Sequence, residues 1–127
     1  MLLEKRWFSG TLALIIAMFI FYVSSISKFP TAVYQITFAS IAYHIRIFFP
    51  FSLFFLAAIK GNGKIKTSHI ALALAISIIC AISDEFHQLF VPSRQCSIID
   101  VLFDSTGILA STFLSLLVYI KKLNKRL

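Results

Sequence analysis

Residues 83–107 read SDEFHQLFVPSRQCSIIDVLFDSTG. Four of the five acidic residues of the chain lie in this window, namely Asp84, Glu85, Asp100 and Asp104. The sequence on either side is dominated by Leu, Ile, Phe and Ala. Carboxylates are costly in apolar surroundings unless they are paired, protonated or hydrated. A strongly apolar chain that gathers its acids in one window is therefore predicted to build a polar site there.

The composition is that of an integral membrane protein. Hydrophobic residues make up 59% and charged residues 13% of the 127 residues, whereas soluble domains carry about 25% charged residues. The net charge is +7. The basic residues behind it lie mostly at the ends of apolar runs and form no basic face interleaved with aromatic residues, which argues against nucleic-acid binding. Cys80 and Cys96 are predicted to be free thiols, because two cysteines make no disulfide framework.

Four apolar runs are long enough to cross a bilayer, which takes about 20 residues. The predicted helices cover residues 8–26, 37–59, 67–89 and 99–120. The first run exceeds the apolar core of a signal peptide and no small-x-small cleavage site follows it, which favours a retained helix. Gly107 and Ser111, one turn apart in the last run, favour close helix packing. We therefore predict an all-α membrane protein, a bundle of four transmembrane helices in one domain over residues 1–127.

The basic residues predict the orientation of this bundle. If the N-terminus is cytoplasmic, most of them fall on the inside: Lys5, Arg6, Lys60, Lys64, Lys66, Lys121, Lys122, Lys125 and Arg126. The outside then holds only Lys28 and Arg94. This bias satisfies the positive-inside rule, so both termini are predicted to be cytoplasmic and the acidic window to face outward.

Several polar residues are predicted to share one depth in the outer half of the bilayer. At a rise of 1.5 Å per residue, Asp84 and Asp104 lie roughly 8 Å from the outer ends of their helices, and His44 about 10 Å. Asp84, His87 and Gln88 share one helix face, because their spacing is i, i+3 and i+4. All four helices are thus expected to place polar groups at one level in the outer half of the bilayer.

The charged residues each allow a functional and a structural interpretation. Asp84 and Glu85 are interpreted as a proton-transferring, cation-binding or headgroup-binding pair, or else as partners of Arg94 or Arg46 in an internal ion pair. Arg94 is suited to a bidentate clamp on a phosphate or carboxylate, or to neutralising Asp100. Arg46 lies within the second apolar run and must either reach a carboxylate or extend to the surface.

The histidines raise the question of a metal site. Asp84-x-x-His87 has the i, i+3 spacing used in carboxylate-bundle metal sites. Because no second such pair occurs, plain polar roles are favoured for His87 and His44, and no metal is predicted. The sequence identifies no cofactor. Gln88 and Asp104 are also explained as interhelical hydrogen-bonding residues.

The acidic window resembles the signature of the VanZ-like family of small bacterial membrane proteins. The pattern is Asp-Glu-x-x-Gln-x-Phe-x-Pro-x-Arg, followed by Asp-x-x-x-(Asn or Asp)-x-x-Gly. The matching positions are Asp84, Glu85, Gln88, Phe90, Pro92, Arg94, Asp100, Asp104 and Gly107. His44 fits the histidine that the family carries in its second helix, whereas Ser40 and Ile41 stand where the family often has an Asp-Lys pair. The resemblance implies a multi-pass protein of the bacterial cytoplasmic membrane, with a role in the cell envelope and in susceptibility to the glycopeptide teicoplanin.

Two functions follow from these residues. The first is an envelope protein that binds a lipid headgroup or envelope precursor at the outer side of the bilayer, and its ligand-binding candidates are His44, Arg46, Gln88, Arg94 and Asp104. The second is an intramembrane enzyme acting on a lipid-linked phosphate or sugar. Its catalytic candidates are Asp84 and Glu85 as acid and base, with Asp100. An ion or proton carrier is disfavoured, because the inner halves of the helices look almost wholly apolar.

Overall fold

The computed structural model describes residues 5–27 and 38–124, and within these residues every regular element is a helix. The four helices are α1 (Arg6–Ser24), α2 (Phe38–Lys60), α3 (Thr67–Gln88) and α4 (Ile98–Asn124). Each is long and apolar enough to cross a membrane, which confirms the prediction of an all-α bundle with four membrane-spanning helices. Residues 1–4, 28–37 and 125–127 lie outside the described residues. They include Lys28, Lys125 and Arg126, which entered the prediction of orientation.

The predicted helix bounds differ from the observed ones mainly at the two ends of the chain. α1 begins at Arg6 and ends at Ser24, where the sequence predicted 8–26. α4 continues to Asn124, beyond the predicted end at residue 120, so its last turn carries Lys121 and Lys122. Basic residues in the last turn favour a helix, because they offset the partial negative charge of its C-terminus.

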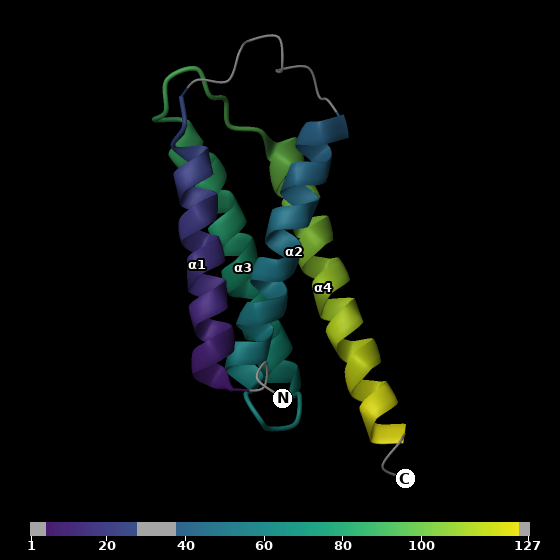
Figure 1. Cartoon of the computed structure of the whole chain (residues 1–127). Helices are drawn as coiled ribbons and strands as arrows, with labels where there is room; N and C mark the ends of the chain where they lie inside the picture. The colour runs from purple at the N-terminus through teal and green to yellow at the C-terminus, as the bar shows by residue number, and fades with distance from the viewer. Residues whose placement is uncertain (1–4, 28–37, 125–127) are drawn as a thin grey trace.

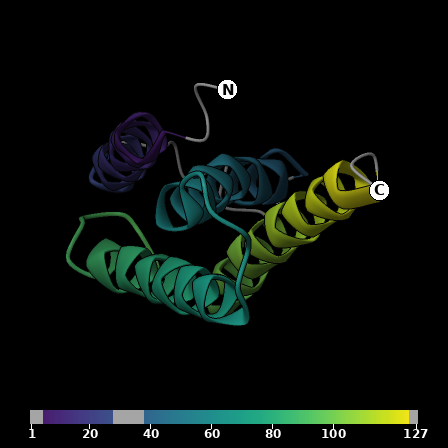
Figure 2. The same cartoon turned by 90° about the horizontal axis from the view of Figure 1, so that it is seen from below.

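α2 is the central helix of the bundle. It packs against α1, α3 and α4, whereas no packing joins α1 to α4 among the described residues. Figure 1 shows the start of α1 and the end of α4 at the same end of the bundle, with α4 diverging from its neighbours toward its C-terminus. Seen along the bundle, α2 lies between α1 on one side and α4 on the other (Figure 2). The N-terminal end of α2 therefore meets the C-terminal end of α3 and the N-terminal end of α4.

A close approach of backbones fixes the contact between α2 and α4. A Cβ atom on Gly107 would lie 2.5 Å from the Ile45 carbonyl oxygen and 3.2 Å from the Phe49 nitrogen. Only glycine leaves room for this contact, as is common where membrane helices pack closely. The close packing expected at Gly107 is thus present, and it lies within one turn of Asp104 on α4 and next to His44 on α2.

The loop between α3 and α4 is a short, specific turn. Ser93 has φ 66°, in the left-handed region that few non-glycine residues occupy. α4 then starts with the Asp100 N–H donating to the Ser97 hydroxyl at 3.4 Å, an N-terminal cap of the usual serine type. Asp100 in the first turn of α4 adds a favourable charge at the positive end of the helix dipole.

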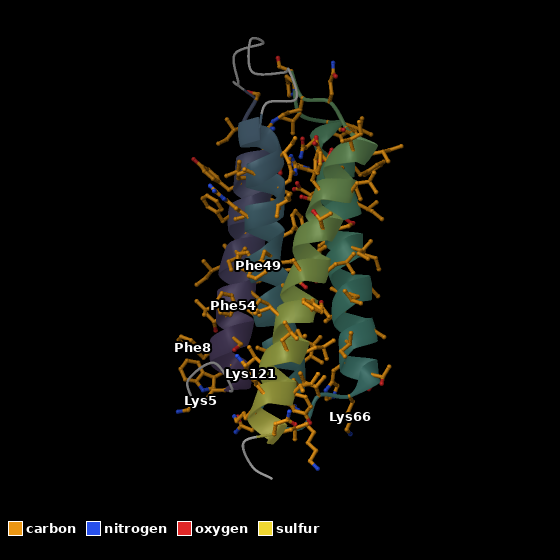
Figure 3. The ribbon with its side chains drawn as sticks, turned by 90° about the vertical axis from the view of Figure 1, so that its right-hand side faces the viewer. Lys5, Phe8, Phe49, Phe54, Lys66 and Lys121 are labelled. Atoms are coloured by element: carbon orange, nitrogen blue, oxygen red, sulfur yellow. The ribbon has the colours of Figure 1, made fainter. Side chains whose placement is uncertain are left out.

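The two ends of the bundle differ in the charges they carry. In Figure 3, Lys5, Lys66 and Lys121 lie at one end, whereas oxygen-bearing side chains gather between the helices at the other. Between these ends, the outer faces of the helices expose large apolar side chains, among them Ile15, Phe19, Ile79, Leu109 and Phe113. An apolar belt of this kind is the surface that a lipid bilayer solvates.

Candidate functional site

Three helices contribute to one group of buried and half-buried polar side chains, here named the polar cluster. Its members are His44 of α2, Asp84, Glu85 and Gln88 of α3, and Asp100 and Asp104 of α4. They lie at the end of the bundle opposite Lys5, Lys66 and Lys121. The structure therefore brings together six of the eight residues that the sequence predicts as site residues.

His44 links α2 to α4. Its Nδ1 lies 2.9 Å from Oδ1 of Asp104, and its Nε2 lies 3.8 Å from Oδ1 of Asp100. The pair His44–Asp104 is buried, and Asp104 is 0% exposed. The close approach at Gly107 brings the α2 backbone near enough to α4 for this hydrogen bond, so the packing of small residues and the polar contact depend on each other.

Glu85 joins α3 to the start of α4. Its Oε1 accepts a hydrogen bond from the Gln88 side chain at 3.1 Å, and its Oε2 accepts one from the Ser97 N–H at 2.9 Å. The residue is only 1% exposed. Both carboxylate oxygens are thus occupied by donors from the protein, which holds the side chain in place and stabilises the turn before α4.

Asp84 occupies the α1 side of the cluster. The Gln88 side-chain nitrogen donates to its Oδ2 at 3.2 Å, so this one amide bridges Asp84 and Glu85. The Ser24 hydroxyl at the end of α1 also hydrogen-bonds the Asp84 carboxylate. Asp84 is half-buried, in contrast to Glu85. Within the described residues, α1 therefore reaches the polar cluster through the Ser24 hydroxyl.

Arg94 ties the loop after α3 to the end of α1. Its Nε donates to the Ile26 carbonyl at 3.2 Å, and its Nη2 donates to the Val23 carbonyl at 2.9 Å. Carbonyls at a helix C-terminus lack intrahelical partners, and a guanidinium is a suitable donor for them. Two donors of Arg94 are accordingly directed at the protein's own backbone.

Arg46 and His87 lie apart from the polar cluster. Arg46 is exposed on α2 and pairs with no carboxylate within the described part of the chain. Of the two roles predicted for it, reaching a carboxylate or extending to the surface, the structure shows the second. His87 faces α1, where its Nε2 lies 3.0 Å from the Ser25 hydroxyl and its ring packs on Phe21 at 4.5 Å between centroids. Asp84 and His87 thus both face the end of α1, where they meet neighbouring serines, Ser24 and Ser25.

The sequence analysis missed two features near the cluster, one of which a sequence pattern signals. The backbone N–H of Ser97 binds Glu85, and the spacing Ser97-x-x-Asp100 before an apolar run is a helix-capping signal that would have placed it. Tyr43 precedes His44, and its hydroxyl is buried without a hydrogen-bond partner among the described residues. No sequence pattern distinguishes Tyr43 from the other aromatic residues of the second apolar run.

The members of the cluster differ in how accessible they are. Glu85 and Asp104 are buried, whereas the Asp100 side chain is 27% exposed and Asp84 is half-buried. His44, Glu85 and Asp104 also offer metal-ligating atoms that all lie within 4.8 Å of one another. The arrangement is thus able to bind hydrogen-bond donors from outside, to exchange protons between carboxylates and imidazole, or to ligate a cation.

Comparison with known proteins gives one family match. The model of the family described as VanZ/LLP1 matches residues 6–119. No curated protein and no solved structure matches the chain. The matched range contains the whole polar cluster and nearly all of the four helices.

Proposed function

The chain belongs to the VanZ/LLP1 family and is a multi-pass membrane protein, and from this premise we propose that it is a cell-envelope protein whose polar cluster binds the headgroup of a lipid or lipid-linked envelope precursor. Binding of this kind would alter the susceptibility of the cell to glycopeptides such as teicoplanin, as the resemblance to VanZ-like proteins implies. The observation that carries the proposal is the gathering of four carboxylates, two buried and two half-buried, and one buried imidazole at a single end of an apolar bundle.

The charge distribution supports a site on the outer side of the membrane. Lys5, Lys66 and Lys121 lie at the end of the bundle away from the polar cluster. Positive residues flanking membrane helices are retained on the cytoplasmic side. The polar cluster would then face outward, where glycopeptides act.

The contacts within the site favour a ligand that donates hydrogen bonds. Carboxylates outnumber cations in the polar cluster, and Arg94 directs two donors to α1 carbonyls. Ionised carboxylates only accept hydrogen bonds, so hydroxyl and amino groups of a headgroup are their natural partners. Asp100 and Asp84 are the accessible acids, whereas Glu85 and Asp104 are buried and already contact Gln88, Ser97 and His44.

Lipid co-purification tests this proposal. The wild-type protein, Asp100→Asn and Lys64→Gln would be purified from the same host membranes, and the bound lipids would be identified by mass spectrometry. We expect one lipid class to be enriched on wild type and Lys64→Gln and to be lost from Asp100→Asn. Asp100 is suited to this test because it is partly exposed, so the isosteric change should leave the fold intact. Equal lipid profiles for all three folded proteins would contradict the proposal.

Teicoplanin susceptibility provides the cellular readout. Cells expressing wild type or Lys64→Gln are expected to need a higher inhibitory concentration than cells expressing Asp100→Asn at the same membrane level. An inhibitory concentration that does not depend on the protein at all would separate lipid binding from glycopeptide susceptibility and refute the second part of the proposal.

An intramembrane enzyme acting on a lipid-linked phosphate or sugar is the second candidate function. The observation that favours it is His44, which lies between Asp104 at 2.9 Å and Asp100 at 3.8 Å. A histidine oriented by a buried carboxylate is a common acid–base arrangement. Asp84 and Glu85 of α3 are its proposed acid and base, with Asp100, and a carboxylate oxygen of Glu85 lies within 4.8 Å of a ring nitrogen of His44.

The same lipid preparations distinguish the two functions. Incubation of wild type with host lipids would change the mass of one lipid class if the protein is an enzyme, and Glu85→Gln would abolish that change while retaining the lipid. Binding without any change in mass would support the headgroup-binding function instead. A folded wild type that neither binds nor converts a lipid would refute both.

A further inference from the structure

Three buried side chains from three different helices converge in the polar cluster. His44 comes from α2, Glu85 from α3 and Asp104 from α4, and one ligating atom of each lies within 4.8 Å of the other two. All three residues are buried. Imidazole and carboxylate are the donor types that first-row divalent metal ions accept in proteins.

The separations are close to those of ligands on one ion. Two donors bonded at about 2.1 Å to the same ion lie at most about 4.2 Å apart. The ligating atoms, which lie within 4.8 Å of one another, therefore need only small rotations of the three side chains to reach bonding distance of one shared ion. Glu85 is already oriented by Gln88 and by the Ser97 N–H, as metal-binding carboxylates usually are by their outer partners.

One atom of this group has no partner. Asp104 is 0% exposed, so water does not reach its side chain. Its Oδ2 also lacks a hydrogen bond within the part of the chain that the structure describes. A buried carboxylate oxygen without a partner is costly, and no donor among the described residues reaches it. A bound cation would satisfy this oxygen and would also reduce the repulsion between the carboxylates of α3 and α4.

From these contacts we infer that His44, Glu85 and Asp104 form a binding site for a divalent first-row transition metal ion such as Mn²⁺ or Zn²⁺. Three protein ligands leave coordination positions open for water or an external group. The site is distinct from the pair Asp84-x-x-His87 that the sequence singled out, because His87 faces α1. The inference goes beyond the proposed lipid binding and stands on different residues from the Asp100 test.

Electron paramagnetic resonance with Mn²⁺ tests the site directly. Metal-free wild-type protein in detergent would be titrated with MnCl₂, and the loss of the sharp signal of free Mn²⁺ would give the bound amount. We expect one Mn²⁺ per chain, displaced by Zn²⁺. His44→Gln and Glu85→Gln are each expected to lower the affinity by roughly 100-fold or more, because loss of an outer-shell partner alone costs 10–100-fold.

His87→Gln is the matched control. It removes a second histidine at the same end of the bundle that is not one of the three ligands, and it should bind Mn²⁺ within about threefold of wild type, below the loss seen even for outer-shell partners. Because a ligand variant can also lose stability, the shift of the thermal unfolding midpoint by Mn²⁺ is measured in parallel. Mn²⁺ should raise the midpoint of wild type and His87→Gln and leave that of Glu85→Gln unchanged.

Two results would overturn the inference. The first is a folded wild type that binds neither Mn²⁺ nor Zn²⁺ at about 1 mM, a concentration that reveals even weak affinity. The second is an equal loss of binding in His44→Gln and His87→Gln, which would indicate nonspecific binding at the polar end. Neither result affects the lipid co-purification test, so failure of the metal site and failure of the proposed function remain distinguishable.

Discussion

The polar cluster and the opposite, basic end of the bundle hold their charges in different ways. In the cluster, Glu85 and Asp104 are buried and each accepts hydrogen bonds or pairs with a named neighbour. At the basic end, Lys5, Lys64 and Lys66 are exposed. A buried charge must be compensated by the fold, whereas an exposed one is compensated by water. Substitutions should therefore be costly at the first end and nearly neutral at the second.

The largest effect is expected for Asp104→Ala. It removes the hydrogen-bond partner of His44 at 2.9 Å from a fully buried position, and the unpaired imidazole together with the cavity left behind should cost about 3 kcal/mol or more. The free energy of unfolding in mixed micelles would measure it. Asp104→Asn, which keeps an acceptor oxygen for His44, should lose less. A loss below about 1 kcal/mol for Asp104→Ala would mean that the His44–Asp104 contact is not a structural link.

Gly107→Ala should be the next most damaging change. The added Cβ would lie 2.5 Å from the Ile45 carbonyl oxygen, and overpacking typically costs about 1–3 kcal/mol. The sign of the change in unfolding free energy is diagnostic, because Gly→Ala in an unhindered helix interior stabilises a protein by about 1 kcal/mol. Ala110→Leu is the control, since Ala110 is exposed on the same helix. A stabilised Gly107→Ala protein would contradict the close contact between α2 and α4.

Arg94→Gln is expected to have a smaller and more local effect. It removes the hydrogen bonds to Val23 and Ile26, which at a half-buried site are worth about 1–2 kcal/mol together. Amide hydrogen exchange should become faster at the end of α1 and remain unchanged at the end of α4. Faster exchange in both helices would show instead that Arg94 stabilises the bundle as a whole.

Lys64→Gln should change the unfolding free energy least. Lys64 is exposed in the loop between α2 and α3, and surface substitutions of this type usually fall within about 0.5 kcal/mol. The same unfolding assay would measure it beside Asp104→Ala. A loss comparable to that of Asp104→Ala would remove the distinction between the two ends on which these predictions rest.

The sequence predicted the composition of the polar cluster better than its internal contacts. Spacing placed Asp84 and Gln88 on one helix face, and the shared amide of Gln88 bridges Asp84 and Glu85 as that face allows. Spacing also placed His87 on this face, and both His87 and Asp84 meet the end of α1, His87 by packing on Phe21. Periodicity defines which residues share a face but not which neighbouring helix that face meets.

Arg46 and Arg94 show the same limit for the basic residues. Both were predicted as ligand-binding candidates, because arginines near carboxylates suit anionic groups. Arg46 is exposed, and Arg94 directs two donors to the carbonyls at the end of α1. Those carbonyls, of Val23 in α1 and Ile26 just after it, lie 71 and 68 positions away in the chain, so local sequence carries no signal for the contact.

The sequence by itself determined that this protein is a bundle of four apolar helices with its acids in one window, because hydrophobic length and charge placement act locally along the chain. It also carried the family signature. The tertiary structure alone decided that His44 pairs with Asp104 and that Glu85 binds the Ser97 N–H. These contacts depend on the crossing of α2 and α4 at Gly107, and such a crossing is set by the shapes of two distant segments together.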